Sequence, residues 1–173
     1  KGLIAEYEAP ESKDEYRPYA LNLHHKHLPE MQVYSELAHA PLFAPAVGRF
    51  AQGMAVNVPL QLWALPGKQT PRQVRGALRA HYAGEAFVTV ADDEETRALV
   101  RAKTVAAGYA PALDPEALNG TNSLKLYVFG EDDGEQALLV AILDNLGKGA
   151  SGAAVQSLNI MLGLDEDAGL TRG

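Results

Sequence analysis

The chain has 173 residues and a formal net charge of -7 at pH 7, from 22 acidic and 15 basic side chains. Because nucleic acids are bound by clustered lysine and arginine, this balance argues against a nucleic-acid partner. No apolar run approaches the roughly 20 residues that a membrane helix needs, so we expect no membrane partner either.

The length suits one domain with its own hydrophobic core. The chain contains no cysteine, so these residues offer no disulfide, no thiolate metal ligand and no cysteine nucleophile. No secretory signal is visible, which makes the cytoplasm the expected location.

The first third of the chain is rich in loops. We expect a short helix at residues 3–7 and, because YALNLHHKH partly alternates, a strand at residues 19–27. Pro29 ends that strand and begins a short helix. Residues 42–50 are expected to form a loop and a strand, since the flanking prolines exclude a helix interior.

The middle of the chain has the clearest periodicity. Residues 54–65 alternate as a strand does, and Pro59 predicts that this strand lies at a sheet edge or contains a bulge. The Thr-Pro pair at 70–71 predicts the start of a helix that Gly84 ends. Two further elements follow, a strand at 87–90 and a helix or insertion at 94–107.

Two β-rich runs, residues 123–129 and 136–143, flank the acidic turn GEDDGE and predict a hairpin. The last element, residues 150–162, has helical spacing and can end at Gly163. Helices and strands are interspersed, but few strand–helix–strand units repeat. The pattern therefore predicts an α+β domain with a mixed, largely antiparallel sheet covered by helices.

The densest polar group comprises His24, His25, His27 and Glu30. On a strand, His25 and His27 would share a face. Imidazoles titrate near neutral pH, so acid/base work is one interpretation. An anion site and an exposed polar strand end are the others. We expect no metal, because only Glu30 offers a nearby third ligand.

A glycine-rich turn, DNLGKGASG, covers residues 144–152 and matches the G-x-G-x-x-G pattern of dinucleotide folds. Only 21 residues follow Gly152, too few for a Rossmann half. The glycines could admit a cofactor to a helix N-terminus, or they could let the helix pack closely. From the pattern alone, close packing is the favoured interpretation.

Four stretches together resemble one family. HKHLPEM at 25–31 resembles its His-basic-His-x-Pro-Glu motif, and GTN at 120–122 resembles its Gly-Ser/Thr-Asn element. DNLGKGASGAAVQSLNIMLGLDEDAGL at 144–170 is similar to its C-terminal signature, and HAPLFAPAVGRFAQGMAVNVPLQL at 39–62 to its shorter-chain subgroup. The order and spacing resemble the C-terminal half of the N-acetyl-gamma-glutamyl-phosphate reductase family.

The resemblance implies an NADP-dependent enzyme of arginine biosynthesis that reduces an acyl phosphate, N-acetyl-glutamyl 5-phosphate, to N-acetyl-glutamate 5-semialdehyde and phosphate. It implies one substrate-binding and dimerisation domain over residues 1–173, like the C-terminal domain of glyceraldehyde-3-phosphate dehydrogenase, in a homodimer or homotetramer. The NADP-binding Rossmann domain and the nucleophilic cysteine would lie upstream of Lys1. We therefore expect this chain alone to be inactive. The terminal helix, within residues 145–164, would pack on that N-terminal half.

The resemblance also implies roles for individual residues. His25 would be the catalytic acid/base that activates the thiol and handles the proton of the tetrahedral intermediate. Three residues would bind or position the substrate: His27, Glu30 and Asn122. Three others would meet the nicotinamide end of the cofactor: Asn145, Gly147 and Lys148.

Two alternatives stay open at this point. A non-catalytic dimerisation or binding module would keep the scaffold without chemistry. The absence of cysteine favours that module, whereas the presence of His25, His27 and Glu30 together favours the enzyme. A related reductase of lysine biosynthesis would act on an aminoadipyl phosphate held on a carrier protein, and nothing in this half discriminates substrate length.

Overall fold

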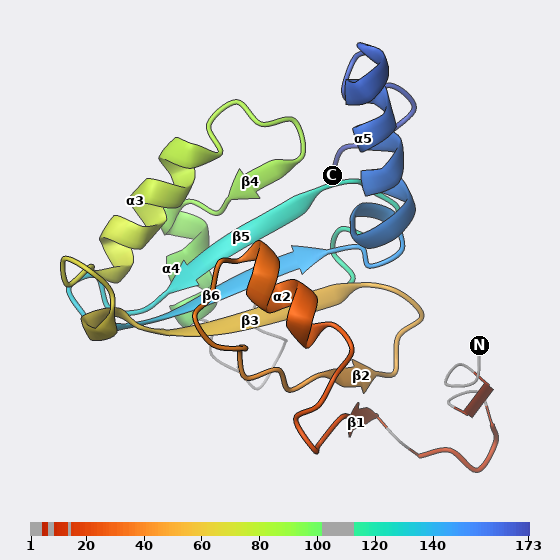
Figure 1. Cartoon of the computed structure of the whole chain (residues 1–173), viewed down its shortest axis with the longest axis horizontal. Helices are drawn as coiled ribbons and strands as arrows, with labels where there is room; N and C mark the ends of the chain where they lie inside the picture. The colour runs from red at the N-terminus through yellow and green to blue at the C-terminus, as the bar shows by residue number, and fades with distance from the viewer. Residues whose placement is uncertain (1–4, 7–8, 14, 102–112) are drawn as a thin grey trace. The chain divides into compact units, whose positions relative to one another are not determined.

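The structure, a computed structural model, describes residues 5–6, 9–13, 15–101 and 113–173 (Figure 1). The chain divides into two compact units, Lys1–Ala51 and Gln52–Gly173, and each is described by itself. The helix expected at residues 3–7 lies largely outside the described residues, as does the end of the one expected at 94–107. The single domain expected over the whole chain stays a prediction.

The described part of the first unit includes two short strands and the helix α2. β1 (Tyr16–Pro18) pairs antiparallel with β2 (Ala46–Gly48), which confirms a strand within residues 42–50. Between them lies α2 (Leu28–Tyr34), with a proline in its first turn as predicted. The helix buries none of its residues, so its side chains are free for contacts other than a core.

The strand expected at residues 19–27 is wrong. That segment consists of turns, and Ala20 and Leu23 have φ angles of 50° and 55°. A positive φ is incompatible with an extended strand. The alternation of YALNLHHKH therefore does not reflect two faces of a sheet, and the segment turns twice before α2 begins.

The second unit is built on a four-stranded sheet in the order β3-β6-β5-β4. Its strands are β3 (Met54–Gln61), β4 (Val88–Val90), β5 (Leu124–Phe129) and β6 (Gln136–Leu143). β6 pairs antiparallel with both β3 and β5, and β4 pairs parallel with β5. This arrangement confirms the mixed, largely antiparallel sheet, the hairpin, and the edge position of the strand that carries Pro59.

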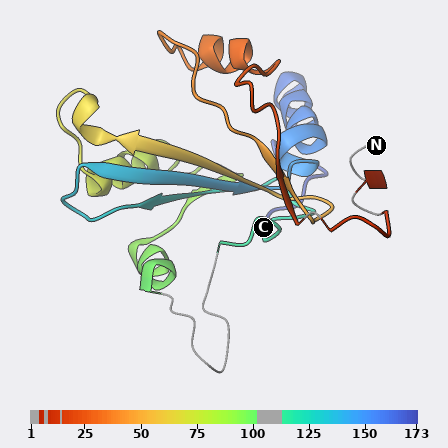
Figure 2. The ribbon, with the colours of Figure 1, turned by 90° about the horizontal axis from the view of Figure 1, so that it is seen from below.

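Two helices pack against this sheet. α3 (Pro71–His81) begins with a capping box, in which Thr70 Oγ1 accepts from the Gln73 backbone and Gln73 Oε1 accepts from the Thr70 backbone. Its apolar residues pack with Val128, whereas those of α4 (Asp93–Arg101) pack with Val140 on the other face. Figure 2 views the sheet nearly edge-on, with α4 on one side of it. Each face thus has its own core.

The chain ends in a helix that follows β6 directly. A π-helical turn, η2 (Gly147–Ser151), leads into α5 (Gly152–Leu162). Gly163, with a φ of 69°, ends the helix as predicted. Over the described parts of the chain, no helix combines the length and apolar character needed to cross a membrane.

Candidate functional site

His25, His27 and Glu30 come together in the first unit, at the start of α2. The Nδ1 atom of His27 lies 3.0 Å from Oε2 of Glu30. The backbone N–H of His27 donates to Nδ1 of His25 at 3.3 Å, and the two ring centroids are 4.9 Å apart. The two imidazoles are therefore neighbours as predicted, but a turn rather than a strand makes them so.

The two imidazoles have opposite hydrogen-bonding roles. Because Nδ1 of His25 accepts a backbone N–H, the neutral ring carries its proton on Nε2 and offers a donor there. Because the carboxylate of Glu30 is an acceptor, neutral His27 carries its proton on Nδ1 and offers Nε2 as an acceptor. The pair therefore places one proton donor beside one proton acceptor, as acid/base chemistry requires.

Aromatic side chains hold the His25 ring. Tyr19 and Phe43 lie edge-on to it, at centroid distances of 5.8 and 5.1 Å. His25 is half-buried, whereas the side chains of His27 and Glu30 are 48% and 66% exposed. Within the described ranges, no three His, Cys, Asp or Glu side chains are grouped as a metal ion would need. The arrangement is that of a fixed imidazole with an accessible carboxylate–imidazole pair next to it.

In the second unit, the carboxylate of Asp144 organises the turn after β6. It is 2% exposed and accepts from the backbone N–H groups of Gly120 and Leu146, both at 2.8 Å, and from Nε2 of Gln52 at 3.1 Å. Burial acts to raise the pKa of Asp144, but backbone N–H groups of Gly120, Leu146 and Gly147 outweigh it and lower the pKa. Asp144 therefore stays ionised and fastens three chain segments together.

Asn145 and Gly147 are held by the same turn. The backbone N–H of Gly53 donates to Oδ1 of Asn145 at 2.7 Å, so the NH2 end of that amide points elsewhere. A Cβ on Gly147 would fall 2.5 Å from the Thr121 carbonyl oxygen, so only glycine fits without a shift. This supports the packing interpretation of the glycine pattern at Gly147.

A shared acceptor brings Asn122 and Lys148 together. Nδ2 of Asn122 and Nζ of Lys148 both donate to Oε1 of Gln156, each at 2.8 Å. The amide nitrogen of Gln156 in turn donates to Oε1 of Glu166 at 2.6 Å. Asn122 is 2% exposed, so its side chain is a supporting group inside this cluster. Lys148 also lies over the buried ring of Phe87, with Nζ 5.6 Å from the centroid.

The expected site residues thus form two groups, one in each unit. The first unit holds His25, His27 and Glu30, and the second holds Asn122, Asn145, Gly147 and Lys148. The sequence did not single out Asp144 or Gln156. The Asp-Asn-Leu-Gly pattern was a usable signal for Asp144, because aspartate accepts from backbone N–H groups two residues on. Gln156 carried no such signal, since a glutamine on a helix is usually solvated.

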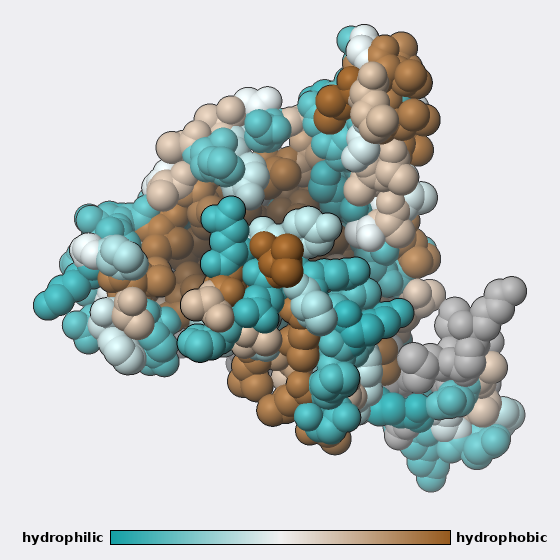
Figure 3. Space-filling model, viewed as in Figure 1, coloured by the Kyte–Doolittle hydropathy of each residue, from teal (hydrophilic) through white to brown (hydrophobic). Residues whose placement is uncertain are grey.

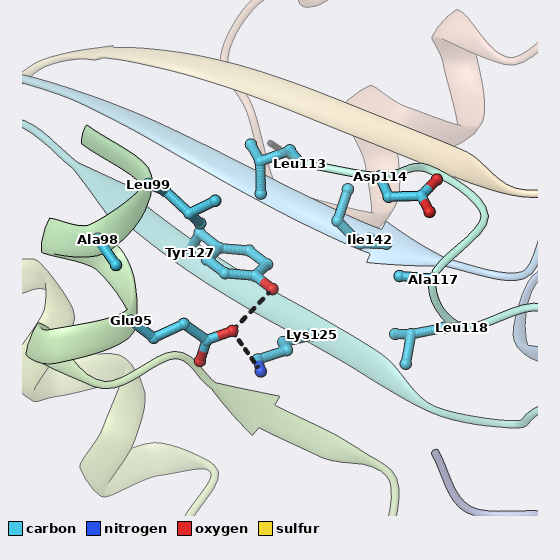
Figure 4. A pocket seen from close by; sticks show the side chains of 10 residues that line it. All are labelled: Glu95, Ala98, Leu99, Leu113, Asp114, Ala117, Leu118, Lys125, Tyr127 and Ile142. Atoms are coloured by element: carbon cyan, nitrogen blue, oxygen red, sulfur yellow. Dashed lines mark hydrogen bonds and ion pairs between the residues drawn. The ribbon is translucent and has the colours of Figure 1, made fainter. Parts of the chain in front are cut away.

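A hollow lies on the α4 face of the sheet (Figure 4). Glu95 lines it and accepts from Lys125 at 2.7 Å and from the Tyr127 hydroxyl at 3.2 Å. Burial and the adjacent Glu95 carboxylate raise the pKa of Tyr127 to about 12. The side chains of Glu95, Lys125 and Tyr127 thus serve as hydrogen-bond and ion-pair partners for one another, which is typical of a structural cluster.

Comparison with known proteins places this fold in a class. Residues 1–145 match the family described as semialdehyde dehydrogenase, dimerisation domain, and the chain belongs to that family. The mixed sheet with its helices is consistent with an α+β domain of this kind.

The curated relatives carry a more particular name. The chain is 51% identical to N-acetyl-gamma-glutamyl-phosphate reductase 2 of Nostoc sp., over 88% of this chain and 45% of that protein. It is 45% identical to N-acetyl-gamma-glutamyl-phosphate reductase of Mesorhizobium japonicum, over 94% of this chain and 50% of that protein. These names confirm the resemblance seen in the motifs. The chain spans about half the length of the curated relatives it matches.

Proposed function

We propose that this chain is the substrate-binding and dimerisation half of a cytoplasmic, NADP-dependent reductase of arginine biosynthesis. The reaction is the reduction of N-acetyl-glutamyl 5-phosphate to N-acetyl-glutamate 5-semialdehyde and phosphate. The names of the relatives support the reaction, and the family description supports a homodimer or homotetramer.

The arrangement of His25, His27 and Glu30 carries the proposal. Reduction of an acyl group through a thiol needs a group that manages the proton of the thiol and of the tetrahedral oxygen. His25 is held by aromatic neighbours and presents its Nε2–H, the donor that an anionic oxygen requires. His27, paired with Glu30, is exposed and can orient the substrate or accept a proton.

The turn after β6 fits the nicotinamide end of a cofactor. Asn145 keeps an NH2 group that has no hydrogen-bond partner in the part of the chain that the structure describes, and Lys148 keeps N–H groups beyond the one given to Gln156. The bound cofactor would supply hydride. These residues would hold its carboxamide, with Gly147 keeping the turn close to Thr121. We propose that Asn122, whose side chain is buried, stabilises the substrate-binding part of the site from inside the fold.

The terminal helix fits an absent N-terminal half. α5 buries only Gly152 and Asn159, and it exposes large apolar side chains along its length. They are Val155, Leu158, Ile160, Met161 and Leu162. Figure 3 shows this apolar surface in brown over α5. A large exposed apolar surface on a helix is normally covered, so we propose that the NADP-binding half of the same enzyme covers it.

The test uses the full-length enzyme and the reverse reaction, phosphate-dependent reduction of NADP by N-acetyl-glutamate semialdehyde. We expect activity in the wild type and a loss of about a hundredfold or more in kcat/KM for His25→Ala, the range for a lost acid/base. The 173-residue chain alone should be inactive. If activity survives His25→Ala, a residue other than His25 is the catalytic acid/base. An inactive wild-type enzyme would contradict the proposed substrate.

A further inference from the structure

We propose that Gln156 is a positioning residue for the cofactor turn, holding the ammonium group of Lys148 by its side-chain oxygen. This inference rests on the proposed cofactor role of Lys148. It adds a residue on α5 that lies outside the group of His25, His27 and Glu30. The observation that carries it is the shared acceptor: one amide oxygen receives both Lys148 and Asn122 at 2.8 Å.

The orientation of the Gln156 amide is determined by its other contacts. Its nitrogen donates to Oε1 of Glu166 at 2.6 Å, so its oxygen must face Asn122 and Lys148. Asn122 is buried and donates to that oxygen, and an amide turned over would set its own NH2 group against this donor. Three partners thus fix one side chain, and that side chain fixes Lys148.

A neutral acceptor suits a lysine that must bind a ligand. Across the described residues, Lys148 makes no ion pair with a carboxylate, and its fixed acceptor is the amide oxygen of Gln156. The ammonium is therefore not paired directly with a carboxylate and has two more N–H groups to offer. Burial lowers the pKa of Lys148, while Glu166 acts in the opposite direction. The ring of Phe87 beneath the ammonium further restricts where it can go.

The experiment is a double-mutant cycle in the full-length enzyme, with KM for NADP and kcat as the readouts. Gln156→Leu keeps the helix preference of the side chain but removes the acceptor. Lys148→Met removes the ammonium. Ala77→Leu, at an exposed position of α3 and away from the proposed sites, is the control for adding leucine to a helix surface.

We expect Gln156→Leu to raise KM for NADP about tenfold, equivalent to about 1.4 kcal/mol, with kcat within about threefold of the wild type. Added to Lys148→Met, it should raise KM less than twofold further, since the group it positions is gone. Ala77→Leu should leave both constants unchanged.

Three outcomes would overturn the inference. If Gln156→Leu raises KM for NADP by the same factor in the Lys148→Met background as in the wild type, Gln156 is a general structural residue. A lowered melting temperature with an unchanged KM for NADP would do the same. If Lys148→Met itself leaves KM for NADP unchanged, the proposed cofactor role of the turn fails, and the role of Gln156 fails with it.

Discussion

Gly152 lies so close to Asn122 that a Cβ at position 152 would fall 2.3 Å from Oδ1 of Asn122. That oxygen is buried and has no hydrogen-bond partner among the described residues, while the nitrogen of the same amide donates to Gln156. The first residue of α5 is therefore in contact with the group that supports Gln156. The glycine permits this approach between the helix and the strand that follows Asn122.

The first prediction concerns this contact. Gly152→Ala should lower the free energy of unfolding by about 1–3 kcal/mol, because the methyl group must displace a buried amide. Gly76→Ala is the matched control: a Cβ there meets nothing within 4 Å, in the middle of α3. That change should raise stability by about 0.5–1 kcal/mol through helix propensity. Urea unfolding measures both, and equal effects of the two substitutions would contradict the close approach.

The second prediction concerns Asp144 and pH. Its pKa is lower in the folded chain than the value of about 3.9 expected when unfolded, so its stabilising contribution is complete above that value. The contribution is lost as the pH falls from about 3.9 through the folded pKa. Between about pH 5 and pH 3, the wild type should therefore lose more free energy of unfolding than Asp144→Asn does.

Urea unfolding at a series of pH values measures this difference. Asp133→Asn, an exposed carboxylate in the β5–β6 turn, controls for the loss of one negative charge. Parallel pH curves for the wild type and Asp144→Asn would show that the three backbone N–H groups do not hold an ionised carboxylate.

The sequence predicted most elements of the second unit, because the residues that begin, end or restrict these elements lie within them or directly beside them. Thr70 and Pro71 specify a helix start through their own backbone chemistry, and Pro59 restricts its strand to an edge. The segment at 19–27 could not be predicted in the same way. Its turns depend on contacts made after folding, such as that of the Tyr19 N–H with the Pro45 carbonyl oxygen at 3.0 Å.

The residues of the candidate site also differ in whether their contacts are local in the sequence or arise only from tertiary structure. The histidine group was visible in the sequence because His25, His27 and Glu30 are close in the chain. Gln156 was not, because its partners Asn122 and Glu166 are 34 and 10 residues away. A glutamine becomes a positioning group only when tertiary structure surrounds it with donors and acceptors.

The third prediction concerns the pair of His27 and Glu30. Glu30→Gln in the full-length enzyme should lower kcat/KM about tenfold, because an amide no longer provides the charged acceptor that fixes the His27 ring. Glu36→Gln, which neutralises an exposed carboxylate just beyond α2, is the control. Steady-state kinetics in the direction of NADP reduction gives the comparison. Equal activities of the two variants would leave the His27–Glu30 contact without a catalytic role.

The fourth prediction concerns the exposed face of α5. Leu158 and Met161 are 51% and 81% exposed and lie one turn apart, so they occupy neighbouring positions on the helix surface. Replacing both by glutamate should change the free energy of unfolding of the 173-residue chain by less than about 0.5 kcal/mol, as expected for surface positions. In the full-length enzyme, the same change would bury two carboxylates against the N-terminal half. We therefore expect a lower melting temperature and a loss of activity there, measured by calorimetry and NADP reduction. A full-length variant with unchanged melting temperature and activity would mean that this face of α5 does not meet the NADP-binding half.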